Sequence, residues 1–240
     1  PAAGFLVMAS VLTVQAFFFA DGGLLALGCT IWNLGIYPCF IAYPLLYRPL
    51  AGGNPTPGRV AAASLVAAVL GLELGALAVV LETVASGVSE LPFRSFALLM
   101  LPIHLAIGLV EGLATAGVVA FVLKARPETL ADAGGRERSR GLAAAFGFLA
   151  LFLAGGLSWF ASERPDGLEW SIAHVTGAEE PKAPLGGLHG LLRGFQDKTS
   201  LLSGYALPRS QAETGGEPAP TAQAETGLAG LVGGILTLAL

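Results

Sequence analysis

Apolar residues form blocks long enough to cross a lipid bilayer, separated by short polar connectors. A spanning helix needs about 20 consecutive, mostly apolar residues. The blocks that meet or approach this length are residues 4–20, 24–47, 60–85, 95–123, 141–161 and the shorter 226–240. The pattern predicts an all-α protein, a polytopic membrane helical bundle, with a polar insert at 162–226 between the last two blocks.

The second block differs from the others because it contains two prolines and several polar or small residues. They are Gly28, Asn33, Gly35, Pro38 and Pro44. Irregular backbone at membrane depth is tolerated where it lines a cavity or is buried in protein. We therefore expect this span to be broken or kinked.

The composition agrees with a membrane protein. Only 12% of the residues are charged and 54% are hydrophobic, whereas a soluble domain carries about 25% charged residues. The insert holds fourteen charges and the two blocks beside it, 141–161 and 227–240, hold none. The net charge of −4 gives no basic surface of the kind that binds nucleic acid, so we expect no nucleic-acid partner.

Basic residues in the short loops indicate the orientation. Cytoplasmic loops carry an excess of Lys and Arg, and the connectors 48–59 and 124–140 are rich in them. We expect both loops to be cytoplasmic, which places the insert 162–226 on the extracytoplasmic side of the cell (inner) membrane.

The fourth block contains the most suggestive polar group. His104, Gly108 and Glu111 share one helix face, and a neighbouring helix could approach closely at the glycine. One interpretation is a structural hydrogen-bond pair between helices; the other is direct involvement in ligand binding.

Other polar residues are weaker candidates. Asn33, Glu73 and Glu82 lie within predicted spans, and Glu73 is deep enough to need a partner. Asp21 opens an Asp-Gly-Gly turn, for which an ordinary turn and a functional site remain open. His174 and His189 match no metal-ligand spacing, so solvated loop histidines are the favoured interpretation.

Catalytic motifs are missing from the sequence. It has no Gly-rich phosphate loop, HExxH or CxxC motif, and no Ser–His pair in a catalytic arrangement. We therefore expect a protein that is not an enzyme and that does not itself hydrolyse ATP.

Several segments resemble the CbiM/NikM family, the substrate-capture components of cobalt and nickel energy-coupling-factor transporters. The resemblance lies in residues 7–36, which include Asp21-Gly22-Gly23, and continues in residues 81–87 and 104–115. Residues 165–170, Pro-Asp-Gly-Leu-Glu-Trp, resemble the signature of the companion N component, the PDGLE domain. Residues 204–208 are similar to its Asp-Tyr-x-x-Pro element, with Gly204 in place of the acid.

The resemblance implies a fusion of two components. Residues 1–124 would be the CbiM/NikM-like membrane domain, 125–140 a cytoplasmic basic linker, and 141–240 the N component. In the N component, two membrane helices would flank the external loop 162–226.

The resemblance also implies a function. The chain would be the substrate-specific membrane component of an ECF-type ABC importer for nickel or cobalt ions. Ni²⁺ or Co²⁺ would be substrate rather than cofactor, and no cofactor is expected. The partners would be a transmembrane coupling (T) component, cytoplasmic ATPase subunits and membrane lipid. The alternative is a structural or regulatory membrane subunit without its own metal site.

The family's metal ligands come from an N-terminal Met-His-Ile-Pro-Asp-Gly segment and a Gly-Thr-Ser-Gly-His loop, which suit Ni(II) in a nearly square-planar set. Neither segment occurs in residues 1–240. We expect a fragment cut at both ends, with the primary metal ligands upstream of Pro1. The resemblance makes Asp21, Asn33, His104 and Glu111 residues that support the ligands or line the cavity wall.

Overall fold

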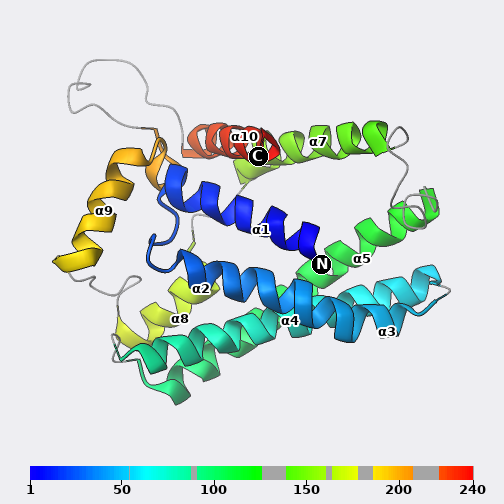
Figure 1. The fold of residues 1–240 in the computed structure, drawn as a ribbon, viewed down its shortest axis with the longest axis horizontal. Helices are drawn as coiled ribbons and strands as arrows, with labels where there is room; N and C mark the ends of the chain where they lie inside the picture. Colours follow the sequence, from blue (N-terminus) through cyan, green and yellow to red (C-terminus); the bar gives the residue numbers. More distant parts are fainter. Residues whose placement is uncertain are drawn as a thin grey trace. The chain divides into compact units, whose positions relative to one another are not determined.

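The computed structural model describes residues 1–53, 55–87, 91–125, 139–160, 164–177, 186–207 and 222–239. These residues form helices and turns, and none of them lies in a strand (Figure 1). The all-α fold class expected from the sequence is confirmed. The chain folds as two compact units, and each combines segments that are distant in sequence.

Among the described residues, four helical segments are long and apolar enough to cross a membrane: Ala2–Phe19, Leu27–Ala51, Pro57–Ser86 and Phe93–Lys124. They coincide with the first four predicted spans. The last two blocks form shorter apolar helices, Ala143–Gly155 and Ala224–Ala239, so their full predicted lengths are not seen in the described residues. The first of these ends at Gly155, where adjacent glycines weaken a helix and a short 3-10 turn, η3 (Leu157–Phe160), follows.

The second span stays helical without interruption, although it contains Pro38 and Pro44. It consists of α2 (Leu27–Ile31), η2 (Trp32–Tyr47) and α3 (Arg48–Ala51). Its central part, η2, has the wider π-type hydrogen bonding. Proline lacks an N–H and clashes with an α-helical turn, and π-type segments are a known way for a helix to depart locally from α geometry. We expected this span to be broken or kinked; the structure instead shows a continuous helix whose central part changes from α-type to π-type hydrogen bonding.

The first unit contains residues 1–8, 29–135 and 164–182. In it, η2 packs against α4 (Pro57–Ser86), and α4 packs against α5 (Phe93–Ala125). Glycines make these contacts close: a Cβ on Gly75 would lie 2.9 Å from the backbone oxygen of Asn33, and one on Gly108 only 3.2 Å from the Cα of Val69. The predicted close approach at Gly108 is confirmed, and it is typical of small residues between membrane helices.

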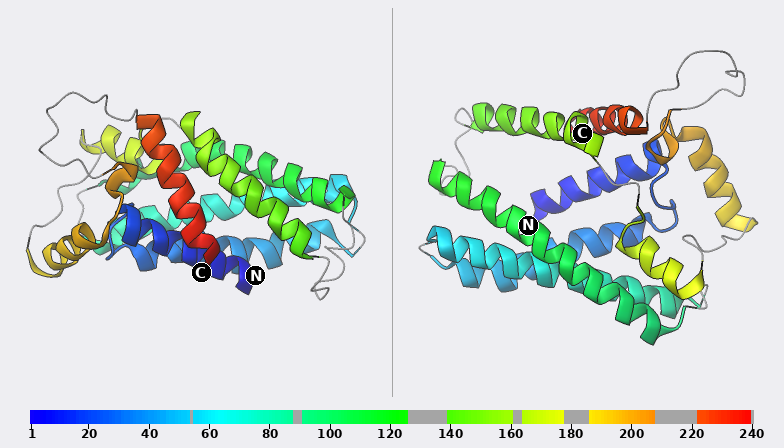
Figure 2. Two further views of the ribbon diagram at one scale, coloured as in Figure 1. Left: turned by 90° about the horizontal axis from the view of Figure 1, so that it is seen from above. Right: turned by 180° about the vertical axis from the view of Figure 1, so that it is seen from behind.

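The second unit contains residues 9–28, 136–163 and 183–240. Its helices are the later part of α1 (Ala2–Val14), the π-type η1 (Gln15–Phe19), α7 (Ser139–Gly155), α9 (Gly187–Thr199) and α10 (Ala222–Ala239). Helices α7 and α10 lie side by side (Figure 2). A Cβ on Gly155 would approach Leu231 Cδ2 to 2.8 Å, so glycine again permits the contact.

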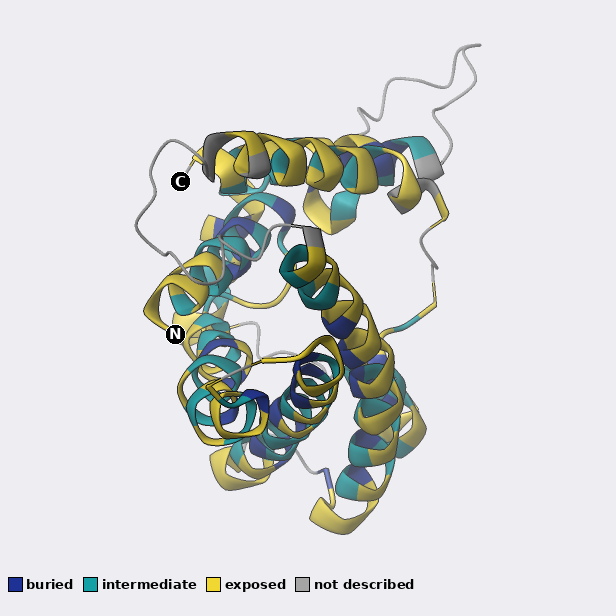
Figure 3. Ribbon diagram, turned by 90° about the vertical axis from the view of Figure 1, so that its right-hand side faces the viewer, coloured by how far each residue is buried: buried dark blue, intermediate teal, exposed yellow. Residues whose placement is uncertain are grey.

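Large apolar side chains are exposed along the spans, where Figure 3 marks many residues as exposed. Leu98, Val110, Leu113 and Phe121 of α5 are each more than 60% exposed. A soluble protein rarely exposes so continuous an apolar surface, whereas a lipid-facing helix does so normally. The exposed surface and the span lengths together give a polytopic membrane bundle.

The compact units do not follow the order of the chain. Residues 164–182, which come late in the sequence, pack with the helices of residues 29–135, and residues 9–28 pack with residues 183–240. The predicted linker 125–140 lies almost wholly outside the described residues, as do residues 208–221 of the insert.

Candidate functional site

The Asp-Gly-Gly turn follows directly on the first span. Ala20 adopts a left-handed conformation (φ 53°), and its N–H bonds to the Gln15 carbonyl, so the helix ends there. Gly22 is also left-handed (φ 74°), a conformation that glycine adopts without strain. Asp21 lies between them, and its exposed side chain is free to bond outside the helix.

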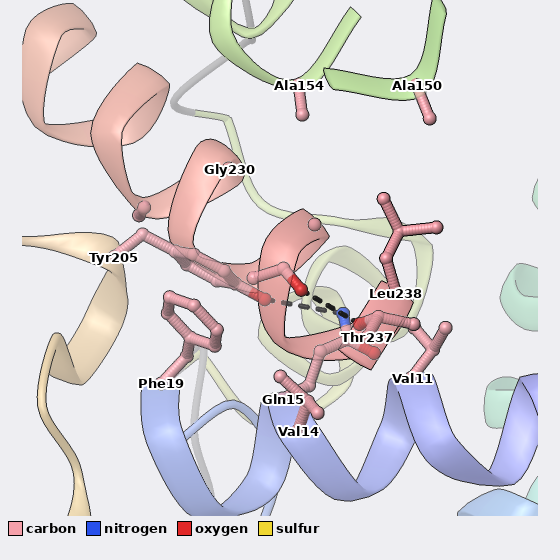
Figure 4. Close-up of a pocket in the computed structure, with 13 residues that line it drawn as sticks. Val11, Val14, Gln15, Phe19, Ala150, Ala154, Tyr205, Gly230, Thr237 and Leu238 are labelled. Atoms are coloured by element: carbon pink, nitrogen blue, oxygen red, sulfur yellow. Dashed lines mark hydrogen bonds between the residues drawn. The ribbon is translucent and has the colours of Figure 1, made fainter. Parts of the chain in front are cut away.

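The partners of Asp21 come from residues 9–28 and 183–240. The Tyr205 hydroxyl donates to Oδ2 of Asp21. Gln15 Nε2 donates to the same oxygen and to the Tyr205 hydroxyl oxygen, each at 3.3 Å; Figure 4 shows Gln15 and Tyr205 facing each other. The three side chains therefore form one hydrogen-bonded triad.

Burial and the neighbouring carboxylate raise the pKa of Tyr205 above its ordinary value of 10.0. Burial is the larger cause, and the hydrogen bond to Asp21 adds to it, while the hydrogen bond from Gln15 acts in the opposite direction. The hydroxyl thus stays protonated at physiological pH, which allows it to donate to Asp21.

The backbone holds Tyr205 in place beside the first span. The N–H groups of Leu201 and Leu202 both donate to the Phe18 carbonyl, at 2.9 and 3.1 Å. The Tyr205 ring stacks on Phe19, with centroids 5.1 Å apart and an angle of 18°. Tyr205 also has a positive φ of 61°, which is uncommon for a residue other than glycine.

Gln196 of α9 makes a second connection to the turn. Its Nε2 donates to the carbonyls of Ala16, at 2.9 Å, and Gly22, at 2.7 Å. Carbonyls at a helix end lack partners within the helix. The buried Gln196 donates a hydrogen bond to one such carbonyl before Asp21 and to one after it. The turn is therefore tied to residues 196–205 at several points.

A pocket of about 350 Å³ lies beside the triad, among α1, α7 and α10. Its lining is mostly apolar, and Gln15, Tyr205 and Thr237 are its polar residues (Figure 4). The polar atoms are already engaged: Thr237 Oγ1 donates to the Gly233 carbonyl, and the other two belong to the triad. The pocket's chemistry is thus that of an apolar cavity.

Asn33 lies in the first unit, where its partner is Glu82. It is 4% exposed, and its Nδ2 donates to Glu82 Oε2 at 2.9 Å. Its Oδ1 and the Oε1 of Glu73 are buried without a hydrogen-bond partner among the described residues. Buried unpaired polar atoms are costly, so these two oxygens mark places in the bundle where a further donor or a cation would be favourable.

His104 has a fixed ring orientation. Its Nδ1 lies 2.7 Å from the Met100 carbonyl oxygen, an arrangement in which Nδ1–H donates to the carbonyl. The ring lies within electrostatic range of the Glu73 carboxylate. Glu111, on the same helix face by spacing, is exposed. The structure thus gives His104 and Glu111 different surroundings: His104 is half-buried, and Glu111 is exposed.

The sequence Pro165-Asp-Gly-Leu-Glu-Trp170 forms the start of α8 (Gly167–Thr176). Asp166 is the N-cap and Glu169 the third helical residue, and they form a reciprocal capping box with hydrogen bonds of 2.8 and 3.1 Å. The buried Gly167 faces α5: a Cβ there would lie 3.0 Å from His104 Cε1. Leu168 packs against a core that includes Phe96 and Met100. The motif therefore forms the capped N-terminus of α8, which packs against α5 near His104.

The two histidines of the insert lie on helices rather than in loops. His174 is in α8, where its ring contacts Trp170 with centroids 3.8 Å apart, and His189 is in α9. Both are exposed. In the described part of the chain, no group of three or more His, Cys, Asp or Glu side chains is arranged to hold a metal ion.

Sequence reasoning identified Asp21 but missed its partners Gln15 and Tyr205, and it missed Gln196, which bonds to the backbone on either side of Asp21. Gln15 could have been noticed, because a polar side chain inside an apolar span usually has a partner. Tyr205 lay in the element at 204–208 that resembles the N component, although nothing in that element indicates Asp21. Gln196 carries no signal in the sequence.

Comparison with known proteins assigns the family. Residues 1–129 match the family model CbiM, described as the cobalt uptake substrate-specific transmembrane region. The chain belongs to the CbiM family. Residues 140–240 match a second family model, the PDGLE domain, so this CbiM-family chain carries both segments whose resemblance its sequence indicated.

Relatives of the CbiM-family chain are transport proteins by name, not enzymes. A fused nickel transport protein, NikMN, of Archaeoglobus fulgidus is 32% identical over all of this chain and 70% of its own length. The cobalt transport protein CbiM of Geobacter sulfurreducens is 32% identical over 77% of this chain and 57% of its own. That of Sorangium cellulosum is 33% identical over 52% of this chain and 56% of its own. No solved structure matches the chain.

Proposed function

We propose that this chain is the substrate-specific membrane component of an energy-coupling-factor importer for Ni²⁺ or Co²⁺. The observation that carries the proposal is the match of one continuous chain to both the CbiM and the PDGLE family models. Its full-length similarity to a fused nickel transport protein and its four span-length helices support it.

The two matches support the proposed order of the domains. Residues 1–124 form the CbiM/NikM-like domain, residues 125–140 the linker, and residues 141–240 the N component. The triad of Gln15, Asp21 and Tyr205 supports a single working unit, because it joins a turn of the CbiM-matched segment to a tyrosine of the PDGLE-matched segment.

Asp21, Asn33, His104 and Glu111 act around the metal rather than as its primary ligands. The family's ligand segments do not occur among residues 1–240. Asp21 helps to hold the turn at the end of the first span, and Asn33 with Glu82 crosslinks two spans. His104 is positioned by the Met100 carbonyl, and Glu111 lies exposed on α5.

The partners follow from the importer class. A transmembrane coupling protein and cytoplasmic ATPases supply the energy, since the sequence has no phosphate loop of its own. The basic connectors 48–59 and 124–140 face the cytoplasm of the cell by the positive-inside rule. The loop 162–226 then lies on the external side of the inner membrane.

A second candidate function is a structural or regulatory membrane subunit without metal specificity. The extensive hydrogen bonding between residues 15–22 and 196–205 would serve that role equally well. Deletion of the gene separates the two functions when metal accumulation and complex assembly are measured together.

Cells that lack other nickel and cobalt importers provide the test. We expect Ni²⁺ or Co²⁺ accumulation to require the intact protein, the coupling protein and the ATPases. Deletion of the gene should abolish accumulation while the remaining subunits still assemble. If accumulation continues without the protein, or if its only effect is on assembly, the subunit function replaces the proposal.

A further inference from the structure

Helix α9 has a strongly two-sided pattern of side chains. Leu188, Leu191, Leu192 and Phe195 have the spacing i, i+3, i+4 and i+7, which places them on one helix face. The opposite face carries polar residues such as Arg193 and Asp197. A helix that sorts its residues in this way needs an apolar environment on one side and water on the other.

The apolar face of α9 is open rather than packed. Leu188 is 61% exposed, Leu191 68% and Phe195 48%. The helix is attached to the rest of its unit through a neighbouring face, where Gln196 is buried. The described residues therefore leave most of the apolar face uncovered.

The attachment fixes α9 at the end of a membrane span. Gln196 bonds to the carbonyls of Ala16 and Gly22, which flank the end of the span Ala2–Phe19. The Phe195 ring meets Phe17 edge-on, with centroids 6.4 Å apart and an angle of 87°. In Figures 1 and 2, α9 crosses the direction of α1 rather than running alongside it.

The end of a span is where the hydrocarbon layer gives way to the lipid headgroups. A helix that crosses a span there lies along the plane of the bilayer. Phe195 contacts Phe17, a half-buried apolar residue of the span itself, so the apolar face of α9 continues onto the apolar surface of the first helix. This continuity identifies lipid as the occupant of the open face.

We propose that α9 is an interfacial helix that rests on the bilayer surface. Leu188, Leu191 and Phe195 enter the upper part of the acyl-chain layer, while Arg193 and Asp197 face water. Lys198, which is exposed near the edge of the apolar face, reaches lipid phosphate with its long side chain. The helix fixes residues 196–205, and with them the triad, at a constant depth in the membrane.

Spin labels on single cysteines test this placement. The full chain, with Cys29 and Cys39 replaced by alanine, is reconstituted in phosphatidylcholine–phosphatidylglycerol vesicles. The labelled variants are Leu188→Cys, Leu191→Cys, Arg193→Cys and Asp197→Cys. All four sites are exposed, so the labels should not disturb packing. Relaxation by oxygen reports contact with lipid, and relaxation by chromium oxalate reports contact with water.

We expect labels at Leu188 and Leu191 to favour oxygen by several-fold and labels at Arg193 and Asp197 to favour chromium oxalate. Equal, high accessibility to chromium oxalate at all four sites would overturn the proposal, because the helix would then lie in water. Labels at Leu188 and Leu191 that are immobilised and reached by neither reagent would also overturn it, since a protein would then cover the face.

Discussion

The hydroxyl of Tyr205 donates a hydrogen bond to the carboxylate of Asp21, although the two residues are 184 positions apart. Asp21 belongs to the segment that matches the CbiM model, and Tyr205 to the segment that matches the PDGLE model. The contact therefore joins a turn of the first segment to a tyrosine of the second within one compact unit.

Replacing Tyr205 by phenylalanine tests the contribution of this hydrogen bond. The variant keeps a ring that can stack on Phe19 and loses the donor to Asp21. We expect a loss of about 1 kcal/mol in stability, the usual net value of one hydrogen bond, measured as thermal unfolding in detergent. Tyr37→Phe is the control. A Tyr205→Phe protein as stable as the parent would show that the Tyr205 hydroxyl contributes nothing to stability.

The raised pKa of Tyr205 gives a pH prediction with a definite sign. The folded-state pKa lies above the ordinary value of 10.0, so the folded protein favours the protonated hydroxyl. The stability that the protonated Tyr205 hydroxyl contributes to the folded protein is fully present below pH 10. It is lost as the pH rises from there through the folded-state pKa. We expect this alkaline loss of stability to be smaller in Tyr205→Phe. Identical pH profiles above pH 10 for both proteins would contradict the assignment.

Asn33 and Glu82 should show energetic coupling, because one donates directly to the other. A double-mutant cycle with Asn33→Ala and Glu82→Ala isolates the interaction. We expect a coupling energy of about 0.6 kcal/mol, the average for polar contacts between membrane helices, and at most about 1.7 kcal/mol. The matched cycle pairs Asn33→Ala with Glu111→Ala, since Glu111 is exposed and the hydrogen bond of Asn33 goes to Glu82 instead. Additive effects in the Asn33–Glu82 cycle would contradict the contact.

Gly167 should not tolerate a side chain. A Cβ there meets His104 Cε1 at 3.0 Å, with Ile107 and Ile103 at 3.2 and 3.3 Å. Gly167→Val should therefore destabilise the protein by about 1 to 3 kcal/mol through overpacking and displace the His104 ring. The change at His104 can be measured by the NMR titration of its ring. In the control Gly117→Ala, the added methyl group meets nothing within 4 Å. Equal stability of the parent and Gly167→Val would rule out the close packing of α8 on α5.

The sequence predicted the features that depend on local composition and failed on those that depend on distant partners. Hydropathy located the first four spans, and the glycine at 108 indicated the close approach of a neighbouring helix, which the structure shows to be α4. The shortened fifth helix was not foreseen, because a charge-free block does not reveal that Gly155 and Gly156 end the helix. The bond between Asn33 and Glu82 also required the packing of η2 on α4.

The candidate site shows the same division. Asp21 stood out because a carboxylate beside two glycines at a span end is visible in the sequence alone. Its partner Tyr205 comes into contact with it only when residues 183–240 fold against residues 9–28. His104 and Glu111 share a helix face by spacing, but only the structure shows that the Met100 carbonyl bonds His104 and that Glu111 is exposed.

Metal uptake by a reconstituted importer tests the central claim most directly. The intact protein, its coupling protein and its ATPases are placed in proteoliposomes, and ATP-dependent accumulation of radioactive Ni²⁺ and Co²⁺ is measured with and without this component. We predict that accumulation of one or both ions requires the protein and is reduced in Tyr205→Phe. Equal accumulation with and without the protein, while the coupling protein and ATPases remain active, would contradict its assignment as the metal-specific component.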